Sequence, residues 1–150
     1  MKKIIVITVL IFSTILVNSC KKSNNSGIVN SGYDTGKDKV QWTFDGTSSS
    51  CDSSFVLVSY NRIMAYKDLS GVQAKTFTLN LRSLAVGNYP LSSTTPNVLT
   101  YVIATTLDHT SQSGTVNITA NTGTKMSGNF SAIMENGLPF SGTFSEVPLR

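Results

Sequence analysis

The sequence of 150 residues contains one histidine, His109, and two cysteines, Cys20 and Cys51. A structural zinc site takes four ligands, mostly cysteine and histidine, so these residues cannot supply one. No segment after Cys20 places apolar residues at i, i+3, i+4 and i+7 over two turns, which argues against amphipathic helices. A zinc-bound domain and a helical bundle are therefore both excluded.

The part of the chain that we expect to fold also has no marked excess of positive or negative charge. From Lys39 onward there are seven basic residues (Lys39, Arg62, Lys67, Lys75, Arg82, Lys125, Arg150) and six acidic ones (Asp45, Asp52, Asp68, Asp108, Glu135, Glu146). Nucleic-acid binding normally needs a clustered basic face, and the sequence shows none. We therefore expect no nucleic-acid partner.

The longest apolar run is too short for a spanning helix. It covers residues 4–17, roughly 21 Å as a helix, whereas a span needs about 20 residues. Lys2 and Lys3 precede the run, and a small residue, Ser19, follows it before the chain turns polar. This order predicts a signal peptide over residues 1–19. An uncleaved N-terminal anchor helix is the alternative.

The segment Leu16-Val17-Asn18-Ser19-Cys20 resembles the lipobox of bacterial lipoproteins. The resemblance implies cleavage before Cys20 and acylation of its sulfur. Acyl chains contribute about 0.8 kcal/mol per buried methylene, so several chains anchor a protein stably. We therefore expect a protein of the cell envelope, anchored in the outer membrane. Two basic residues, Lys21 and Lys22, follow the cysteine, where some surface-displayed lipoproteins carry acidic residues. The sequence therefore does not decide between the periplasmic face of the membrane and the cell surface.

The mature chain divides into a tether and one domain. Residues 21–38 are rich in Ser, Asn and Gly without hydrophobic periodicity, and we place the lipidated cysteine and a flexible tether at 20–38. Such a tether spans roughly 25 Å. Residues 39–150 have the length of a single domain.

Alternation of apolar and polar residues predicts that this domain is all-β, with about eight or nine short antiparallel strands in a sandwich or a barrel-like sheet. Four segments alternate with apolar residues on one face, at 40–44, 76–82, 114–120 and 128–134. Three others, at 55–60, 62–67 and 98–106, are more continuously apolar, and we expect them to be covered on both faces.

Turn signals support this reading. Asn136-Gly137 predicts a type I′ hairpin, which with a turn at 120–125 makes the C-terminal third a three-strand meander. Asn61 marks a tight turn, and the polar segment around Cys51 predicts a loop. "SGNF" at 127–130 and "SGTF" at 141–144 are expected on neighbouring strands, each with a glycine where another group approaches closely.

Several ordered motifs carry a family resemblance. They are "VGNYPL" at 86–91, "LTYVIA" at 99–104, "SGTVNIT" at 113–119, "MSGNFSAIM" at 126–134 and "SGTFSEVPL" at 141–149. In this order they resemble an uncharacterised domain-of-unknown-function family of Bacteroidetes lipoproteins. The resemblance implies a compact β domain at the cell envelope, and it implies no catalytic residues.

Residues that could take part in catalysis or metal binding are few and scattered. Asp45 and Asp52 flank a serine-rich segment and could bind calcium with carbonyl oxygens, although a dense acidic loop is missing. Asp108-His109 beside Ser111 and Ser113 offers triad residue types, without a nucleophile elbow. Cys51 is left unpaired if Cys20 is lipidated, and we expect a loop or edge thiol rather than a nucleophile paired with His109.

Aromatic residues are the remaining candidates for ligand contact. Trp42, Tyr60, Tyr66, Tyr89 and Tyr101 either include a platform for sugar stacking or fill the core and the barrel end. We expect a non-catalytic binding or accessory module for a protein, glycan or small ligand, without cofactor or metal. The alternative is a structural or assembly subunit of an envelope complex, and a hydrolase ranks last.

Overall fold

The computed structural model describes residues 34–69, 73–104 and 107–150, so the predicted signal peptide and Cys20 lie outside the described residues. Within these ranges the regular elements are ten strands and one 3₁₀ turn, which confirms the all-β prediction. They are β1 (Val40–Phe44), β2 (Thr47–Ser50), β3 (Ser53–Leu57), η1 (Val58–Tyr60), β4 (Arg62–Lys67), β5 (Lys75–Asn80), β6 (Gly87–Leu91), β7 (Val98–Ile103), β8 (Leu107–Asn121), β9 (Lys125–Met134) and β10 (Pro139–Pro148). A helix long and apolar enough to cross a membrane does not occur among the described residues.

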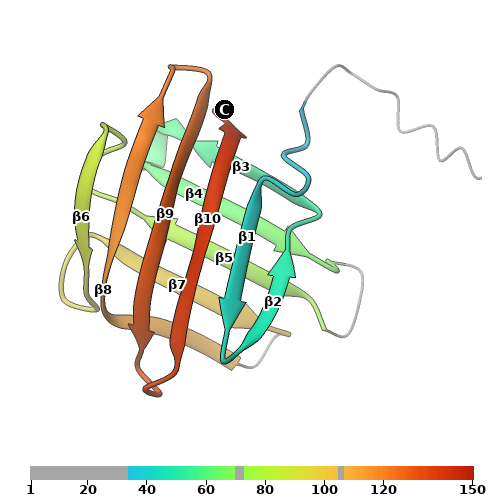
Figure 1. Cartoon of the computed structure of the whole chain (residues 1–150), viewed down its shortest axis with the longest axis vertical. Coiled ribbons are helices and arrows are strands. Elements are labelled where there is room, and N and C mark those ends of the chain that lie inside the picture. Colours follow the sequence, from blue (N-terminus) through green and yellow to red (C-terminus); the bar gives the residue numbers. More distant parts are fainter. Residues whose placement is uncertain (1–33, 70–72, 105–106) are drawn as a thin grey trace, which may run out of the picture. The chain divides into compact units, whose positions relative to one another are not determined.

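All ten strands belong to one antiparallel sheet that curls into a half-barrel. The order is β2-β1-β10-β9-β8-β7-β5-β4-β3, with β6 paired to β8. The 15-residue strand β8 joins the two layers, because its first residues pair with β7 and its later ones with β6 and β9. In Figure 1 the layer of β3, β4, β5 and β7 crosses behind the layer of β6, β9, β10, β1 and β2.

The core lies between these layers, where the alternating residues point as the sequence predicts. Val40 and Trp42 of β1, Phe77 and Leu79 of β5, and Phe130 of β9 are all buried. Ala120 was expected inward beside Val116 and Ile118, but a register shift after Ile118 leaves it exposed. The segments 55–60, 62–67 and 98–104 are not covered on both faces, and the last two residues of the predicted segment 98–106 lie outside the described residues. Their outward side chains are only partly buried, and Val58 and Tyr60 are exposed.

The two Ser-Gly-x-Phe motifs interlock across β9 and β10. Gly128 lies opposite Phe144, and Gly142 lies opposite Phe130. A Cβ atom added at Gly142 would meet Cζ of Phe130 at 2.5 Å and also the carbonyl oxygen of Gln41, and one at Gly128 would meet the ring of Phe144 and the carbonyl oxygen of Asn117. Each glycine thus leaves room for the phenylalanine ring of the other strand. This confirms that the repeated Ser-Gly-x-Phe motif reflects close approach between neighbouring strands.

The hairpins confirm the predicted meander, with one change of turn type. Asn61 is left-handed, at φ 49°, and Gly123, at φ 81°, turns β8 into β9. Between β9 and β10 only Gly137 has positive φ, and its N–H donates to the carbonyl oxygen of Met134 at 2.8 Å. This is a type I turn followed by a left-handed glycine, so the expected type I′ turn at Asn136-Gly137 is wrong.

A type I′ geometry occurs instead at Asp45-Gly46, where both residues have positive φ (47° and 75°). The turn returns the chain beside β1, so residues 47–50 form β2 and Ser53 begins β3. The segment that we expected to be a loop is therefore mostly strand. Its serines show no apolar alternation because β2 is an edge strand with little surface to bury.

Segments from both ends of the domain cover the edge of β3. The backbone N–H of Ser54 donates to Thr35, and Val56 and Val58 exchange hydrogen bonds with Arg150 at 2.8 and 3.1 Å. Gly36 is buried against Ser54. Residues 34–36, which the sequence places in the tether, therefore contact the sheet and protect an edge that would otherwise be open to pairing.

Candidate binding site

Cys51 lies in the short connection between β2 and β3, as a loop thiol was predicted to, but its side chain is buried in the core. Its side chain is 0% exposed, and its sulfur accepts from the N–H of Val40 and donates to the carbonyl oxygen of Gly36, both at 3.3 Å. The thiol is free, and it fills the corner where the chain passes from β2 to β3. Its role there is to pack and to satisfy two backbone groups.

The acidic and triad-type residues do not converge. Asp108 and His109 are adjacent on β8, so their side chains point to opposite faces of the sheet. The ring of His109 packs against Phe44 at 5.1 Å, and its Nδ1 accepts from the amide of Asn136 at 3.1 Å. Ser111 is buried, and its hydroxyl accepts from the N–H of Leu99. The structure therefore assembles neither a triad nor a Cys51–His109 pair from these residues.

The suggested calcium ligands are separated as well. Asp45 lies in the turn before β2 and Asp52 follows its other end. A carboxylate oxygen of Asp52 accepts from the N–H of Asp68 at 2.8 Å. In residues 34–69, 73–104 and 107–150, no group of three His, Cys, Asp or Glu residues could hold a metal ion.

The aromatic candidates divide between core and surface. Trp42 and Tyr101 are buried, and the indole N–H donates to the Tyr101 hydroxyl at 3.3 Å. Burial raises the pKa of Tyr101, and this hydrogen bond partly opposes the rise. Tyr66 and Tyr89 are half-buried, and of the five only Tyr60 is exposed, at 68%, with the Arg62 guanidinium 5.9 Å from its ring centroid. The five therefore do not form one stacking platform.

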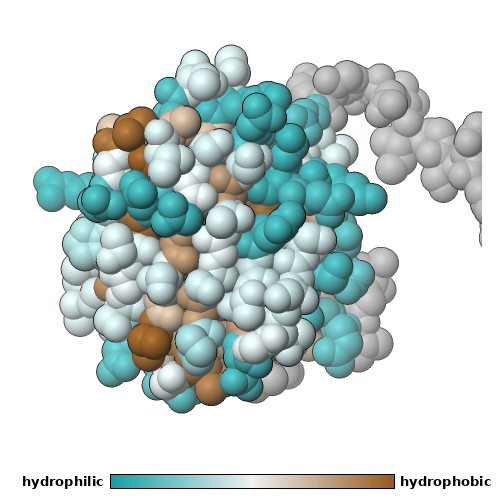
Figure 2. Space-filling view, in the orientation of Figure 1, coloured by the Kyte–Doolittle hydropathy of each residue, from teal (hydrophilic) through white to brown (hydrophobic). Residues whose placement is uncertain are grey.

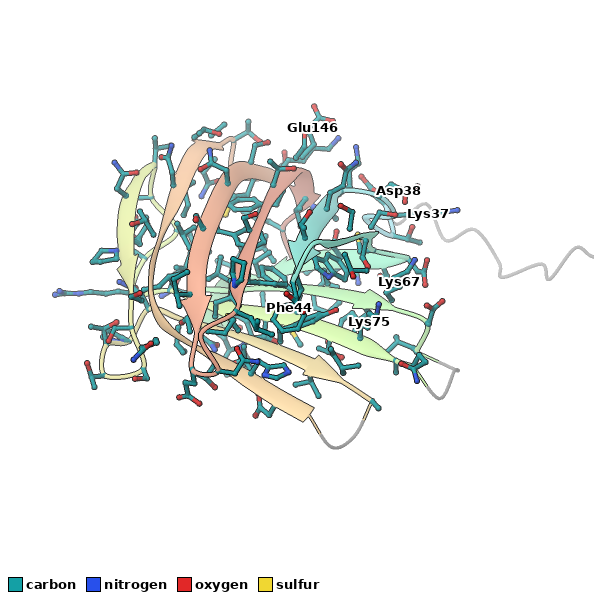
Figure 3. All side chains as sticks on the ribbon, turned by 60° about the horizontal axis from the view of Figure 1, so that its bottom comes forward. Lys37, Asp38, Phe44, Lys67, Lys75 and Glu146 are labelled. Atoms are coloured by element: carbon teal, nitrogen blue, oxygen red, sulfur yellow. The ribbon has the colours of Figure 1, made fainter. Side chains whose placement is uncertain are left out.

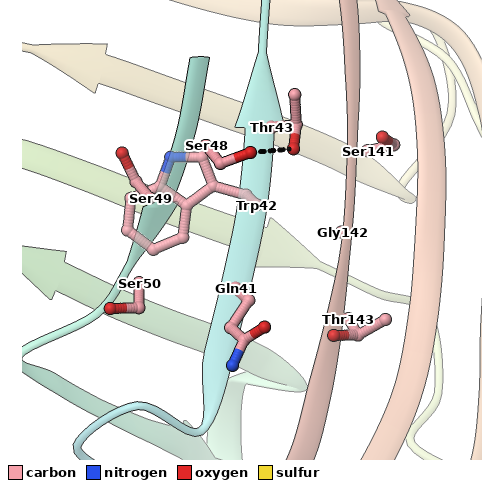
Figure 4. A pocket seen from close by; sticks show the side chains of 9 residues that line it. All are labelled: Gln41, Trp42, Thr43, Ser48, Ser49, Ser50, Ser141, Gly142 and Thr143. Atoms are coloured by element: carbon pink, nitrogen blue, oxygen red, sulfur yellow. Dashed lines mark hydrogen bonds between the residues drawn. The ribbon is translucent and has the colours of Figure 1, made fainter. Parts of the chain in front are cut away.

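A hollow on the outer face of β2, β1 and β10 is larger than a second one at the end of the half-barrel. It has a volume of about 460 Å³, and Figure 4 shows its lining of uncharged side chains. The lining residues are Gln41, Trp42, Thr43, Ser48, Ser49, Ser50, Ser141, Gly142 and Thr143. The Thr43 and Ser48 hydroxyls share a hydrogen bond at 3.0 Å. We call this hollow the polar groove.

The polar groove continues into two cross-strand rows that contain no charged residue. One row is Ser50, Gln41, Thr143, Asn129, Asn117 and Asn88, and the other is Ser48, Thr43, Ser141, Ser131, Thr115 and Pro90. Six adjacent strands make this face roughly 24 Å wide. Over β10, β1 and β2 the surface is pale in Figure 2, as expected for serine and threonine.

Hydrogen-bonding capacity in these rows is largely unused. Among the described residues, the Thr43–Ser48 contact is the only side-chain hydrogen bond within them. Asparagine is depleted in strands, so strand propensity does not explain three asparagines side by side at 88, 117 and 129. Amide and hydroxyl groups both donate and accept, so the face suits a neutral, hydrogen-bonding ligand.

A second, smaller hollow of about 230 Å³ opens at the end of the half-barrel. Its apolar surface comes from Phe44, Tyr101 and Ile103, and its polar rim includes Asp45 and Lys75. Figure 3 views this end, with Phe44 and Lys75 labelled. The volume is below that of usual small-molecule sites, so the polar groove is the better candidate.

The comparison with family models identifies a family that covers most of the chain. Residues 37–148 match the family model described as a domain of unknown function, DUF6252. The chain belongs to the DUF6252 family. No curated protein and no solved structure matches the chain. The DUF6252 match covers all ten strands of the sheet, and with them both hollows.

Sequence reasoning did not find the polar groove. Its lining comes from two segments, 41–50 and 141–143, that are about 90 residues apart and that meet only because β1 pairs with β10. The one available signal was Asp45-Gly46, which predicts a hairpin and hence places β2 beside β1.

Proposed function

We propose that this protein is a lipid-anchored cell-envelope lipoprotein of Bacteroidetes type, whose β domain is a non-catalytic binding or accessory module. The anchor is the lipid on Cys20, in the outer membrane. The observation that carries the binding role is the polar groove, a hollow whose hydroxyl and amide groups mostly make no hydrogen bond to another protein group within the described residues and are open to a ligand.

The chemistry of the groove favours a neutral ligand with many hydrogen-bonding groups, such as a glycan or an extended peptide backbone. A charged ligand would find no side chain of opposite charge here, because neither row contains a charged residue. Large hydrophobic anchors, which dominate tight protein interfaces, have no matching pocket there.

The test blocks the groove in the full-length, membrane-extracted protein. Thr143→Arg places a long side chain in the groove from an exposed position, and Thr119→Arg makes the same change at an exposed position of β8 that belongs neither to the groove nor to the two rows. Crosslinked envelope extracts and a glycan array are compared for the three proteins. We expect a bound protein or glycan that the wild type and Thr119→Arg capture and Thr143→Arg does not. Identical capture by all three would contradict the proposal.

A second candidate, an assembly subunit of an envelope complex, is favoured by the edge of β2. The pairing register directs the backbone of Thr47 and Ser49 toward β1, so Ser48 and Ser50 present their N–H and C=O groups outward. An extended segment of a partner could add there. Ser48→Pro removes one outward N–H; if assembly uses β2, this variant extracts as a smaller particle, and an unchanged native size rejects this role.

A further inference from the structure

Backbone and side-chain contacts gather several segments at one end of the domain. Val58 of η1 donates to the carbonyl oxygen of Arg150 at 3.1 Å, and the amide of Asn61 donates to the carbonyl oxygen of Arg82 at 3.3 Å. The amide of Asn121 reaches Leu84 in the β5–β6 connection at 2.9 Å. Figure 1 shows the C-terminus beside the β8–β9 hairpin at this end.

All three arginines of the chain lie here, together with three exposed apolar or aromatic side chains. We name this surface the arginine end, and it consists of Val58, Tyr60, Arg62, Arg82, Val86 and Arg150. The exposed fractions of Val58, Tyr60 and Val86 are 47%, 68% and 61%. Of the five exposed large hydrophobic residues that the described ranges contain, only Leu69 and Ile133 lie elsewhere.

The arginines keep most of their donors free. Arg62 donates from Nε to Asn80 at 2.6 Å, and Arg150 donates from Nη2 to the carbonyl oxygen of Asp34 at 3.0 Å. Across the described ranges the ion pairs join Glu146 to Lys39 and Lys125, and none involves an arginine. Each guanidinium has five N–H donors that match phosphate geometry, so this end can accept several anionic groups.

The chain leaves the domain next to this surface. The carbonyl oxygen of Asp34, the first described residue, accepts a hydrogen bond from the Arg150 guanidinium. The same guanidinium lies 4.8 Å from the Phe55 ring centroid. Thirteen residues, 21–33, separate Asp34 from Cys20. Thirteen residues reach at most about 45 Å even when fully extended, so a lipid on Cys20 would keep the arginine end within about that distance of the headgroups.

We propose that the arginine end docks on a membrane surface through anionic lipid headgroups. Arginine binds the phosphates, while Tyr60, with an apolar ring and a polar hydroxyl, and the two valines enter the headgroup region. The orientation relative to the anchor rests on the proposed lipidation, but the affinity for headgroups does not. Binding by this end leaves the outer face of β2, β1 and β10 available to a ligand.

The experiment measures partitioning of the chain 20–150 carrying Cys20→Ser, which has no lipid, onto vesicles. Vesicles of phosphatidylcholine with phosphatidylglycerol are compared with pure phosphatidylcholine at low and high salt. We expect salt-sensitive binding to the anionic vesicles alone. Each Arg→Gln change at 62, 82 or 150 should lower the partition coefficient about fivefold. Tyr60→Ser should also weaken binding.

The chain offers matched controls at sites away from the arginine end. Lys67→Gln with Lys75→Gln removes two positive charges, and Leu69→Ser removes an exposed apolar side chain. Lys21 and Lys22 are kept in every variant, and thermal unfolding confirms that each variant folds. Arg82→Gln is the cleanest change, because no hydrogen bond or ion pair of its guanidinium occurs among the described residues.

Four results would overturn the proposal. The first three are no binding to anionic vesicles at low salt, equal loss in the lysine controls, and full binding by a variant with Arg→Gln at all three positions. An arginine-dependent interaction with an acidic protein but not with vesicles would also overturn it. Failure of lipidation is measured separately, by the mass of the full chain expressed in cells, and does not affect the vesicle result.

Discussion

Replacing either interlocking glycine with alanine should destabilise the domain more than an ordinary glycine substitution. A Cβ at Gly142 meets the ring of Phe130 on one side and a backbone carbonyl of β1 on the other. Overpacking of a core costs about 1–3 kcal/mol, and we expect the upper part, about 2–3 kcal/mol, because the strand backbone cannot move aside. For the 117 residues 34–150, this lowers Tm by about 8–12 °C.

The assay is thermal and chemical unfolding of Gly128→Ala and Gly142→Ala beside a control, Gly137→Ala. At Gly137 a Cβ meets nothing within 4 Å, and only its φ of 80° opposes alanine, at about 1 kcal/mol. In a double-mutant cycle, Phe130→Leu should relieve part of the cost of Gly142→Ala, with a coupling of at least about 1 kcal/mol. If Gly142→Ala costs no more than Gly137→Ala, or if the cycle shows no coupling, the interlocking explanation is wrong.

Three further predictions concern stability and chemistry. Cys51 should not react with a thiol reagent in the native protein and should react fully after unfolding, because its sulfur is buried; rapid native labelling would show that the corner is open. Burial raises the folded-state pKa of Tyr101, so its contribution to stability should be constant below pH 10 and fall as the pH rises above the ordinary tyrosine value. Tyr101→Phe should therefore flatten part of the alkaline decline in stability, and an unchanged decline would argue against the shift. Deleting Leu149 and Arg150 removes three backbone hydrogen bonds and should lower the free energy of unfolding by about 2–3 kcal/mol. The deletion also exposes the edge of β3 and should promote aggregation. A deletion protein as stable and soluble as the full chain would show that the two residues are not needed to cover this edge.

Patterns with a local physical cause were predictable from the sequence. Alternation at 76–82 identified β5 and its inward side chains, and Asn61 marked a left-handed turn, because both effects depend on residues close in sequence. The turn type predicted at Asn136 was wrong, because a three-residue hairpin loop that ends in a left-handed glycine has the same residue types as a two-residue type I′ loop. β2 was missed because its serines carry no hydrophobic signal.

Features that depend on pairing between distant segments were not predictable. No local signal shows that β8 passes through both layers, or that residue 41 lies beside residue 143. The arginine end has the same origin, since its residues are contributed by η1, β4, the β5–β6 connection and the C-terminal residue. The burial of Cys51 was not predictable either, because its polar neighbours give no hydrophobic signal for the corner that its side chain fills.

The central claim, a β domain anchored to the envelope by lipid on Cys20, is tested most directly by the mass of the protein extracted with detergent from its own cells. The account predicts a chain that begins at residue 20 and carries the additional mass of acyl groups on its first residue, and a Cys20→Ser chain without that mass. A wild-type chain that retains residues 1–19 and carries no acyl mass would contradict the account.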